Sequence, residues 1–466
     1  MTVPDWVQDA IFYQIFPDRF ANAEPQNNPP NIQPWGAKPA VRQFQGGNLR
    51  GIIQHFDYLI DLGINAIYLN PIFQSPANHR YHTTDYYRID PLLGTMDDFR
   101  ALLQTAHKNN VRIILDGVFN HSSRGFYAFN HILENGEHSP YRYWYHIHRF
   151  PLQAFSPGKA RNFEAWWDIK DLPKFNTDNP LVRRYLFDVA RFWTEQGIDG
   201  WRLDVPSEID DPSFWAEFYH TVKSVNPQAY LTGELWELAP DWVGDARFDG
   251  LMNYPLRTAL LDLLTQRFSL DHFARQINAL VAAYPRPHLH AMYLPLGSHD
   301  TERLITLLKG NLAKTKFAFA FQFAFPGAPA IYYGDEIGLQ GGKDPDNRRA
   351  FPWETTAWNH ELRTWLQHLI SLRKQFPALR RGEFQPVFAS QEHACYAFSR
   401  RHDDQHLLAV FNASGAPRQL RVPTTNFPWP DGQILQNHLS PEDLSVSQQH
   451  VHLTLPPWGA AWITKP

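Results

Sequence analysis

The hydrophobic and polar positions of the chain alternate between short apolar runs and longer segments with helical periodicity. Short apolar runs bounded by turn residues are typical of buried parallel strands. Eight such runs occur, at residues 11–16, 64–69, 111–115, 198–204, 230–232, 250–253, 291–294 and 330–333. Segments with helical spacing lie between most of them, for example at 49–62, 96–109, 180–196 and 212–225. The alternation predicts an α/β fold in which a parallel sheet closes into a (β/α)8 TIM barrel.

Two parts of the chain depart from this alternation. Between residues 120 and 176 the repeat stops, and Trp, Tyr, His and Pro are frequent. An excursion of this length inside a compact fold is usually a lid or a small inserted domain. After about residue 376 short alternating strands follow, at 406–411, 419–422 and 450–455. We therefore expect a barrel over residues 1–119 and 177–380, an inserted domain over 120–176 after the third strand, and a C-terminal all-β sandwich domain over 381–466.

Composition and charge narrow the choice of partner. The 466 residues are 43% hydrophobic and 19% charged, as expected for a folded chain. The net charge is −4 with no long run of either sign, so we expect neither nucleic acid nor a membrane surface as partner. The aromatic content of 15% is high, and Trp and Tyr rings suit the apolar faces of sugars.

The cysteine count and the N-terminal sequence bear on the compartment. Cys395 is the only cysteine, so an intramolecular disulfide is impossible, which fits a reducing environment. Residues 1–20 lack the basic and apolar regions of a signal peptide. No apolar stretch approaches the roughly 20 residues that span a bilayer. We expect a cytoplasmic protein.

The stretch 200–205 (GWRLDV) carries two charges near the end of a predicted buried strand. Side chains alternate faces along a strand, so Arg202 and Asp204 point to the same side. Burying both is costly unless the charges serve each other. A neighbouring cation lowers the pKa of a carboxyl and keeps it ionised, as a carboxylate nucleophile requires. On this stretch alone, a structural ion pair is an equally good interpretation.

Reactive side chains follow several other predicted strands. In a barrel of this type, active sites form at the C-terminal ends of the strands. The residues at these ends are Tyr81 and His82 after the second strand, Asp116 and His121 at the third, Glu234 and Trp236 at the fifth, and His299 and Asp300 at the seventh. A single Asp could be a helix cap, and a lone His is more often structural. Their recurrence at one barrel mouth indicates an active site.

Paired carboxylates at such a mouth favour glycoside cleavage, with one as nucleophile and the other as acid/base. The sequence has no metal-binding cysteine pattern and no GxxxxGK[ST] phosphate loop. Asp204, beside Arg202, is the expected nucleophile. Glu234 lies beside Trp236, where desolvation would raise its pKa toward that of a general acid. Asp300 would hold sugar hydroxyls and stabilise charge on the ring.

Four segments carry a family resemblance. Residues 116–121 (DGVFNH), 200–204 (GWRLD), 233–236 (GELW) and 297–300 (GSHD) resemble, in order, the four signature segments of the α-amylase superfamily, glycoside hydrolase family 13. The resemblance implies a retaining mechanism and an inserted domain B. It assigns Asp204 as nucleophile, Glu234 as acid/base and Asp300 as transition-state stabiliser. The resemblance also implies that Tyr81, Asp116, His121, Arg202 and His299 bind the substrate. We add His82 to this set.

A narrower resemblance concerns residues 172–176 (LPKFN), which are similar to the MPKLN-type segment of neopullulanases, cyclomaltodextrinases and maltogenic amylases. Residues 75–79, 296–300 and 332–338 resemble other segments of that subgroup. In that group Ser298 replaces the Asn that is usual elsewhere in the superfamily. The resemblance implies that Glu208 handles the acceptor sugar and that Trp236 borders the acceptor subsites.

Three features depart from the subgroup. Its additional N-terminal domain is expected to be missing, since the predicted barrel begins at residues 6–20, and we expect a monomer with a more open cleft. The calcium loop has become NAEPQNN at 22–28 and lacks most acidic ligands, so we expect no cofactor and no bound calcium. Pro206 and Ser207 replace the usual Ala-Asn, which would move the acceptor loop.

The expected activity is cleavage of α-1,4-glucosidic bonds in maltooligosaccharides, cyclodextrins and starch, with pullulan and transglycosylation as open options. A 4-α-glucanotransferase or branching-type transferase would use the same intermediate and remains an alternative. An α-1,6-glucosidase is less favoured because of residues 172–176 and 296–300. A non-catalytic carbohydrate-binding relative would typically lose its carboxylates and carry a membrane segment, whereas Asp204, Glu234 and Asp300 are all present.

Overall fold

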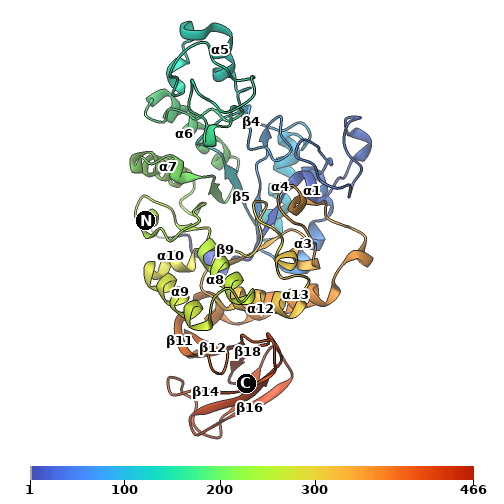
Figure 1. The fold of residues 1–466 in the computed structure, drawn as a ribbon, viewed down its shortest axis with the longest axis vertical. Helices are drawn as coiled ribbons and strands as arrows, with labels where there is room; N and C mark the ends of the chain where they lie inside the picture. The colour runs from blue at the N-terminus through green and yellow to red at the C-terminus, as the bar shows by residue number, and fades with distance from the viewer. Residues whose placement is uncertain (1–2) are drawn as a thin grey trace.

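Eight parallel strands form a closed sheet at the centre of the molecule (Figure 1). The computed structural model describes residues 3–466. The strands are β1 (Phe12–Ile15), β2 (Ala66–Leu69), β5 (Arg112–Gly117), β6 (Gly200–Leu203), β7 (Tyr230–Gly233), β8 (Gly250–Leu251), β9 (Tyr293–Pro295) and β10 (Ala328–Tyr332). They pair in the order β8-β7-β6-β5-β2-β1-β10-β9, and a parallel bridge between Met252 and Tyr293 joins the two edges. The predicted (β/α)8 barrel is confirmed.

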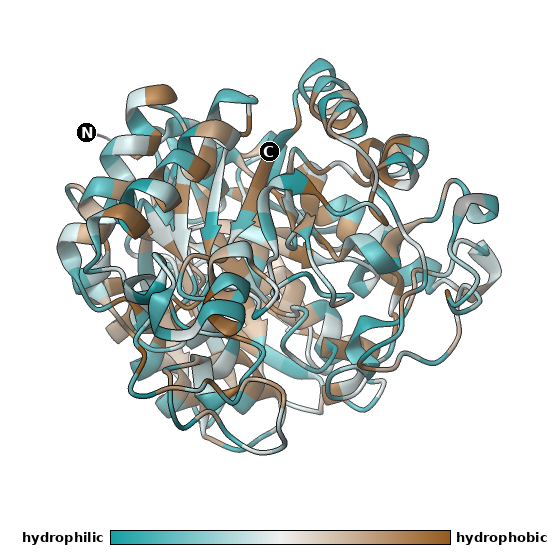
Figure 2. Ribbon diagram, turned by 90° about the horizontal axis from the view of Figure 1, so that it is seen from above, coloured by the Kyte–Doolittle hydropathy of each residue, from teal (hydrophilic) through white to brown (hydrophobic). Residues whose placement is uncertain are grey.

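Helices surround this sheet. They are α1 (Pro17–Phe20), α2 (Leu49–Gln54), α3 (Phe56–Leu62), α4 (Met96–Lys108), α6 (Pro180–Glu195), α7 (Pro212–Val225), α8 (Tyr254–Leu264), α9 (Leu270–Ala283), α10 (Arg286–His290), α11 (Leu304–Leu307), α12 (Leu312–Ala324), α13 (His360–Gln375) and α14 (Pro377–Arg381). Seen from above, the outer helices alternate between hydrophilic and hydrophobic along their length, as amphipathic helices do (Figure 2). In the described part of the chain, none of the helices has the length and apolar character needed to cross a bilayer.

Local sequence explains where several helices begin. Thr95 and Asp98 form a reciprocal capping box at the start of α4. Asp211 caps α7 by accepting from the backbone N–H of Ser213, and a proline follows it at the first helical position. The prediction of a single helix over 49–62 is wrong, because the segment is divided into α2 and α3 at His55. The backbone of His55 has φ −104° and ψ 22°, and its ring stacks on Trp353 with centroids 3.5 Å apart.

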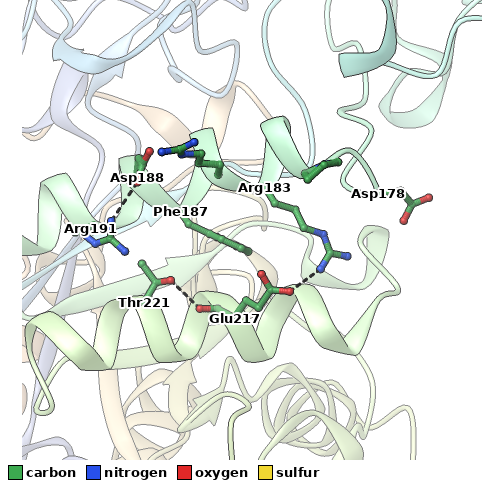
Figure 3. Close-up of a pocket in the computed structure, with 9 residues that line it drawn as sticks. Asp178, Arg183, Phe187, Asp188, Arg191, Glu217 and Thr221 are labelled. Carbon is green, nitrogen blue, oxygen red and sulfur yellow. Dashed lines mark hydrogen bonds and ion pairs between the residues drawn. The ribbon is translucent and has the colours of Figure 1, made fainter.

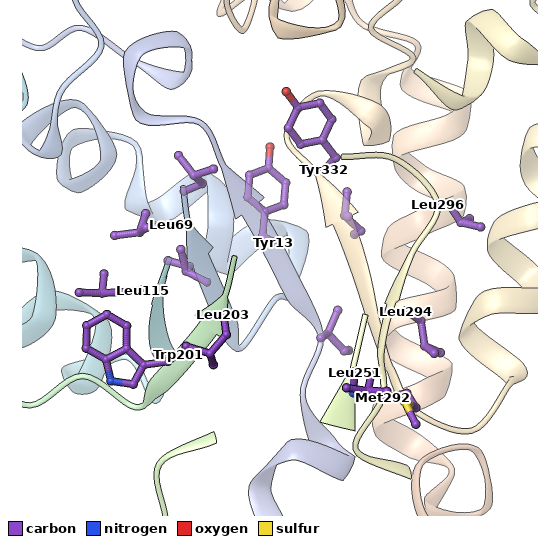
Figure 4. Close-up of a cluster of buried hydrophobic side chains, with 14 of the residues drawn as sticks. Tyr13, Leu69, Leu115, Trp201, Leu203, Leu251, Met292, Leu294, Leu296 and Tyr332 are labelled. Atoms are coloured by element: carbon purple, nitrogen blue, oxygen red, sulfur yellow. Dashed lines mark hydrogen bonds between the residues drawn. The ribbon is translucent and has the colours of Figure 1, made fainter. Parts of the chain in front are cut away.

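Side chains of the barrel strands alternate between two layers. One set points outward to the helices and belongs to the main hydrophobic core; its members labelled in Figure 4 include Tyr13, Leu69, Leu115, Trp201, Leu203, Leu251 and Leu294. The other set points into the barrel and includes Phe12, Tyr68, Ile114, Tyr230 and Tyr293. Polar residues two positions further along the same inward rows reach the C-terminal ends of the strands. This parity brings the candidate site together.

The segment between β5 and α6 stands at the end of the molecule opposite the C-terminus (Figure 1). It contains α5 (Tyr127–Asn135) and several isolated bridges, including His121 with Lys174 and Tyr145 with Phe175. A small antiparallel pair, β3 (Phe73–Gln74) and β4 (Asp85–Ile89), follows β2. The long excursion after the third barrel strand therefore folds over the strand ends on that side.

The last part of the chain is an antiparallel β domain, which confirms the all-β expectation. Its strands are β11 (Glu383–Ser390), β12 (Cys395–His402), β13 (Gln405–Asn412), β14 (Arg418–Pro423), β15 (Ile434–Asn437), β16 (Glu442–Ser447), β17 (His450–Leu455) and β18 (Ala460–Thr464). A buried arginine joins it to the barrel. Arg400 on β12 donates to the carbonyl of Ala324 at the end of α12 and to that of Gly382 before β11.

Candidate active site

Arg202 on β6 lies at the centre of a cluster of carboxylates. Its Nη1 is 2.7 Å from Asp116 Oδ1 and 3.0 Å from Asp204 Oδ1. Its Nη2 is 2.8 Å from Glu234 Oε2, as an ion pair without hydrogen-bond alignment. The guanidinium is 1% exposed. The structure therefore places Arg202 and Asp204 on the same face, as the strand pattern predicts, and adds side chains from β5 and the end of β7.

The pKa of Asp204 differs from the prediction made from the sequence. Burial raises the pKa of Asp204 well above its usual range, and although Arg202 opposes this, Glu234, Asp116 and Asp300 raise it further. The prediction that Arg202 holds the pKa of Asp204 down considered one neighbour, whereas Asp116 and Glu234 also contact that cation and Asp300 lies nearby. Protonation of one member relieves the repulsion on the others. Ionisation of Asp204 is therefore coupled to the proton occupancy of the whole cluster.

Hydrogen bonds from two tyrosine hydroxyls fix the carboxylate of Asp116. The hydroxyl of Tyr81 donates to Asp116 Oδ2 at 2.6 Å, and Tyr68 donates to the same oxygen. The Tyr81 hydroxyl also lies 2.6 Å from His299 Nε2, and the two rings stack with centroids 5.3 Å apart at 6°. Tyr81 and His299, from separate loops, are thereby locked against each other and against Asp116.

Two polar residues that the sequence reasoning missed support His299. Gln14 Nε2 lies 2.9 Å from His299 Nδ1 and donates to Asn70 Oδ1 at 3.0 Å. With Nδ1 accepting from Gln14, the ring proton is on Nε2, facing Tyr81. Burial lowers the pKa of His299 well below its usual range, so the ring is neutral. The sequence signal that could have found them is a polar residue in an apolar strand context: Gln14 lies within β1, and Asn70 directly follows β2.

Glu234 is held by groups on both of its oxygens. Trp236 Nε1 donates to Oε1 at 3.2 Å, and the backbone N–H of Val205 donates to Oε2 at 3.1 Å. Trp236 in turn stacks on Tyr254 with centroids 3.7 Å apart at 9°. Nearly half of Trp236 remains exposed, at 45%. The Trp236 indole therefore orients the carboxylate and leaves surface for a ligand.

Asp300 lies at the solvent side of the cluster. Its Oδ2 is 3.1 Å from His299 Nε2, and its Oδ1 is 3.6 Å from Arg348. The side chain is 31% exposed. Burial and Glu234 raise the pKa of Asp300 to about 7, and Arg348 and Arg202 oppose the shift. A carboxyl with this pKa exchanges its proton near neutral pH.

His121 contributes a buried nitrogen to the same region. Within residues 3–466, its Nε2 has no well-aligned hydrogen-bond partner. Burial lowers the pKa of His121 to about 3, so the ring is neutral. The backbone of Phe175 donates to the Asn120 carbonyl at 3.0 Å, and that of Ser122 donates to the Pro173 carbonyl at 3.1 Å. These bonds fix the segment 172–176 alongside His121.

Two predicted residues lie beside the cluster rather than in it. Glu208 is 3.9 Å from Lys174, an ion pair between the loop after β6 and the inserted segment. His82 packs edge-on against His79 at 4.8 Å, and burial lowers its pKa. Apart from His121, the remaining predicted site residues belong to the network around Arg202 and His299.

The loop at 22–28 offers few carboxylate ligands for calcium. The amide oxygen of Asn22 accepts from the Glu24 backbone at 3.2 Å, and the Glu24 carboxylate lies 3.8 Å from Arg50. The amide groups of Asn22 and Asn28 converge on Gly46, where a Cβ would meet their nitrogens at 2.7 and 2.6 Å and the Asn28 oxygen at 2.9 Å; the Asn27 side chain lies outside the described part. Calcium prefers several oxygen donors, including carboxylates. Among the described residues, no group of three or more His, Cys, Asp or Glu side chains is arranged to hold a metal ion.

A groove on the outer layer is separate from these residues. It lies between α6 and α7 (Figure 3), and its charged side chains largely pair within it or with adjacent residues. Arg183 contacts Glu217 at 2.9 Å, and Arg191 contacts Asp188 at 3.2 Å. The groove contains none of the carboxylates at the strand ends, so the candidate active site is the Arg202 cluster.

Comparison with protein families matches residues 14–381 to the α-amylase catalytic domain. The chain is a member of the α-amylase family of glycoside hydrolases. Residues 387–462 of this family member match the maltogenic amylase C-terminal domain. Together the two matches cover the barrel, the inserted segment and most of the C-terminal β domain, and they confirm the family resemblance of the four signature segments.

Individual relatives extend the family assignment. This α-amylase family chain is 41% identical to a cyclomaltodextrinase of Geobacillus thermopakistaniensis, over 98% of the chain and 77% of that protein. It is 41% identical to neopullulanase 2 of Thermoactinomyces vulgaris, over 98% of the chain and 78% of that protein. The structure of cyclic α-maltosyl-(1→6)-maltose hydrolase from Arthrobacter globiformis superimposes with a TM-score of 0.91 at 37% identity, covering all of both chains.

Proposed function

We propose that this glycoside hydrolase is a retaining α-glucan hydrolase that cleaves α-1,4-glucosidic bonds. The observation that carries the proposal is the shared contact of Asp204 and Glu234 with one guanidinium, that of Arg202. Retaining enzymes need two carboxyl groups about 5–5.5 Å apart, closer than inverting enzymes, which leave room for a water between them. Two carboxylates held on the same planar cation suit the closer spacing.

Asp204 attacks the anomeric carbon and forms a covalent glycosyl-enzyme as the glucosidic C–O bond breaks. Glu234 donates its proton to the departing oxygen and afterwards takes a proton from the water that attacks the intermediate. The indole N–H of Trp236 and the backbone N–H of Val205 stabilise the carboxylate that Glu234 becomes after the first step. Asp300 contacts sugar hydroxyls and stabilises positive charge on the ring.

The remaining residues bind the sugar at the cleavage point. Asp116 is oriented by Tyr81, so its carboxylate is fixed to accept from hydroxyls. The Nε2 of His121 offers a further position for a sugar hydroxyl, whereas the Nε2–H of His299 holds Tyr81 in place. Because both rings are neutral, they add no charge to the site.

The substrate class rests on the relatives. Their names refer to cyclomaltodextrins, pullulan and a cyclic maltosyl-maltose, all of which are α-glucans. Maltooligosaccharides and cyclodextrins are therefore the proposed substrates, with starch and pullulan as further ones. Glu208 and Lys174 form an ion pair beside the carboxylate cluster, and they are proposed to contact the acceptor sugar and permit some transglycosylation. His82, beside Tyr81, supports the donor sugar.

The proposal includes no metal, a monomer and a cytoplasmic location. The contact of the Glu24 carboxylate with Arg50 supports catalysis without calcium. Cys395 is a single buried thiol whose pKa is raised by burial to about 12, which suits a reducing compartment. Monomer formation is checked by the molar mass in solution.

The direct test compares initial rates and products on β-cyclodextrin, soluble starch and pullulan. We expect α-anomeric products by NMR and loss of turnover in Asp204→Asn with its fold retained, because the amide cannot act as the nucleophile. Asp211→Asn, which removes an arginine-paired carboxylate outside the site, is the control and should keep turnover. β-Anomeric products would exclude retention, and transfer products in excess of hydrolysis would identify a transferase.

A further inference from the structure

A ladder of three aromatic rings leads from the candidate active site to the surface. His121 stacks on Trp166 with centroids 5.7 Å apart at 26°, and Trp166 stacks on Trp167 at 4.6 Å and 10°. His121 is 2% exposed, whereas Trp167 is 73% exposed. One end of the ladder is therefore within the sugar-binding region, and the other presents a free ring face to solvent.

The backbone holds Trp167 in this exposed place. In the short helix η5 (Trp166–Asp168), Trp167 has φ 49° and ψ 33°, and the next residue, Asp168, has φ 59°. Positive φ is disfavoured for a bulky residue, and such strain persists where the surroundings enforce it, frequently at binding sites. Here Asp168 accepts from the Ala160 backbone at 2.8 Å and pairs with Lys159 at 2.9 Å.

The ladder also carries an unused polar group. Trp166 Nε1 is inaccessible to solvent, and within residues 3–466 it has no hydrogen-bond partner. An indole N–H buried in a native structure normally finds an acceptor. The Trp166 indole is therefore not satisfied by the protein groups around it. The flat, exposed ring of Trp167 suits the apolar face of a neighbouring glucose unit.

We propose that Trp166 and Trp167 form an outer platform that binds glucose units of a longer α-glucan beyond those held at the carboxylates. The proposal rests on the proposed α-glucan hydrolase function and adds a preference for chain length. Stacking of one ring on a sugar makes its contribution only when the substrate is long enough to reach Trp167. Selection for longer chains is therefore set by this surface, separately from the chemistry at Asp204.

The test compares Trp167→Ala with the wild type on maltotriose and maltoheptaose. We expect the ratio of kcat/KM for maltoheptaose to that for maltotriose to fall about three- to tenfold, mainly through KM. Trp167→Phe should recover most of the ratio. The matched control is Phe155→Ala, since Phe155 is 71% exposed on the same inserted segment but packs over Arg124 at 4.4 Å, away from the ladder; its ratio should stay unchanged.

Binding is measured separately in the Asp204→Asn background by calorimetry with maltoheptaose. Trp167→Ala should weaken that binding by a similar factor. An unchanged ratio and affinity, an equal loss on both substrates, or a change of oligomeric state in Trp167→Ala would overturn the platform. If the wild type hydrolyses neither substrate, the proposed function itself fails; if it hydrolyses both and only the ratio is insensitive to Trp167, the platform alone fails.

Discussion

The backbone N–H of Val205 donates to Oε2 of Glu234 at 3.1 Å, although Val205 has φ 36° and ψ 52°. This left-handed conformation is a marked outlier for a β-branched residue. Pro206 follows, and proline disfavours helical conformations in the residue before it. Val205 comes directly after Asp204, the candidate nucleophile. Its strained backbone therefore carries the N–H that binds Glu234, the candidate acid/base.

Replacing Val205 by glycine should separate strain from stability. Glycine adopts this conformation without steric cost but is freer in the unfolded chain, so we expect the free energy of unfolding to change by no more than about 1 kcal/mol. The amide would lose its enforced direction, and kcat should fall about three- to tenfold. Urea unfolding and steady-state kinetics measure the two quantities.

The control for Val205→Gly is Gln266→Gly, because Gln266 also has a positive φ of 60° but is exposed at the end of α8. It should leave kcat unchanged. A Val205→Gly enzyme with the wild-type kcat would show that the strained peptide has no part in catalysis.

The strand pattern was enough to predict the barrel and the clustering of Arg202 with Asp204, because both follow from side-chain alternation within a short segment. The partners of these residues could not be predicted in the same way. Gln14 reaches His299 across 285 positions of sequence, and a contact of that separation has no local signal. The raised pKa of Asp204 likewise depends on carboxylates from other strands. The exposed Trp167 depends on backbone angles that apolar periodicity does not encode.

Arg202 should be essential for stability as well as for activity. In Arg202→Met the carboxylates of Asp116, Asp204 and Glu234 would be buried without a cation, which costs about 3–5 kcal/mol of unfolding free energy near neutral pH. Lowering the pH should recover part of this loss, because protonation neutralises the same groups. Arg202→Lys keeps a charge but not the planar fork, so it should lose less stability than Arg202→Met while still losing turnover. Urea unfolding at pH 5 and pH 8 tests both variants. Equal stability of Arg202→Met and wild type at pH 8 would contradict the proposed role.

The raised pKa of Asp300 predicts a pH dependence of stability. The folded protein holds this proton up to about pH 7, whereas an unfolded chain releases it near pH 4. The associated stabilisation is complete below the unfolded pKa and is lost as the pH rises through about 7. The effect should be shallow, since Asp300 is 31% exposed and water screens its charge interactions. Asp300→Asn removes the titrating group, so its free energy of unfolding should decline less than that of the wild type between pH 5 and pH 8. Parallel curves for the two proteins would contradict the raised pKa.

Removal of divalent cations should leave both activity and thermal stability unchanged. The Glu24 carboxylate lies near Arg50, which also binds Asp98 at 2.6 Å. The negative charge of Glu24 is therefore already balanced by an arginine. To bind here, calcium would have to displace the contact between Glu24 and Arg50 and be coordinated by amide oxygens in place of carboxylates. We expect the Tm after treatment with EDTA to equal that in millimolar calcium within about 1 °C, because a ligand that does not bind the folded state cannot stabilise it. Differential scanning calorimetry and rates on β-cyclodextrin measure the two properties on the same samples. Magnesium serves as the control for general ionic effects. A rise in Tm with calcium but not with magnesium would show that the loop binds calcium despite its loss of acidic ligands.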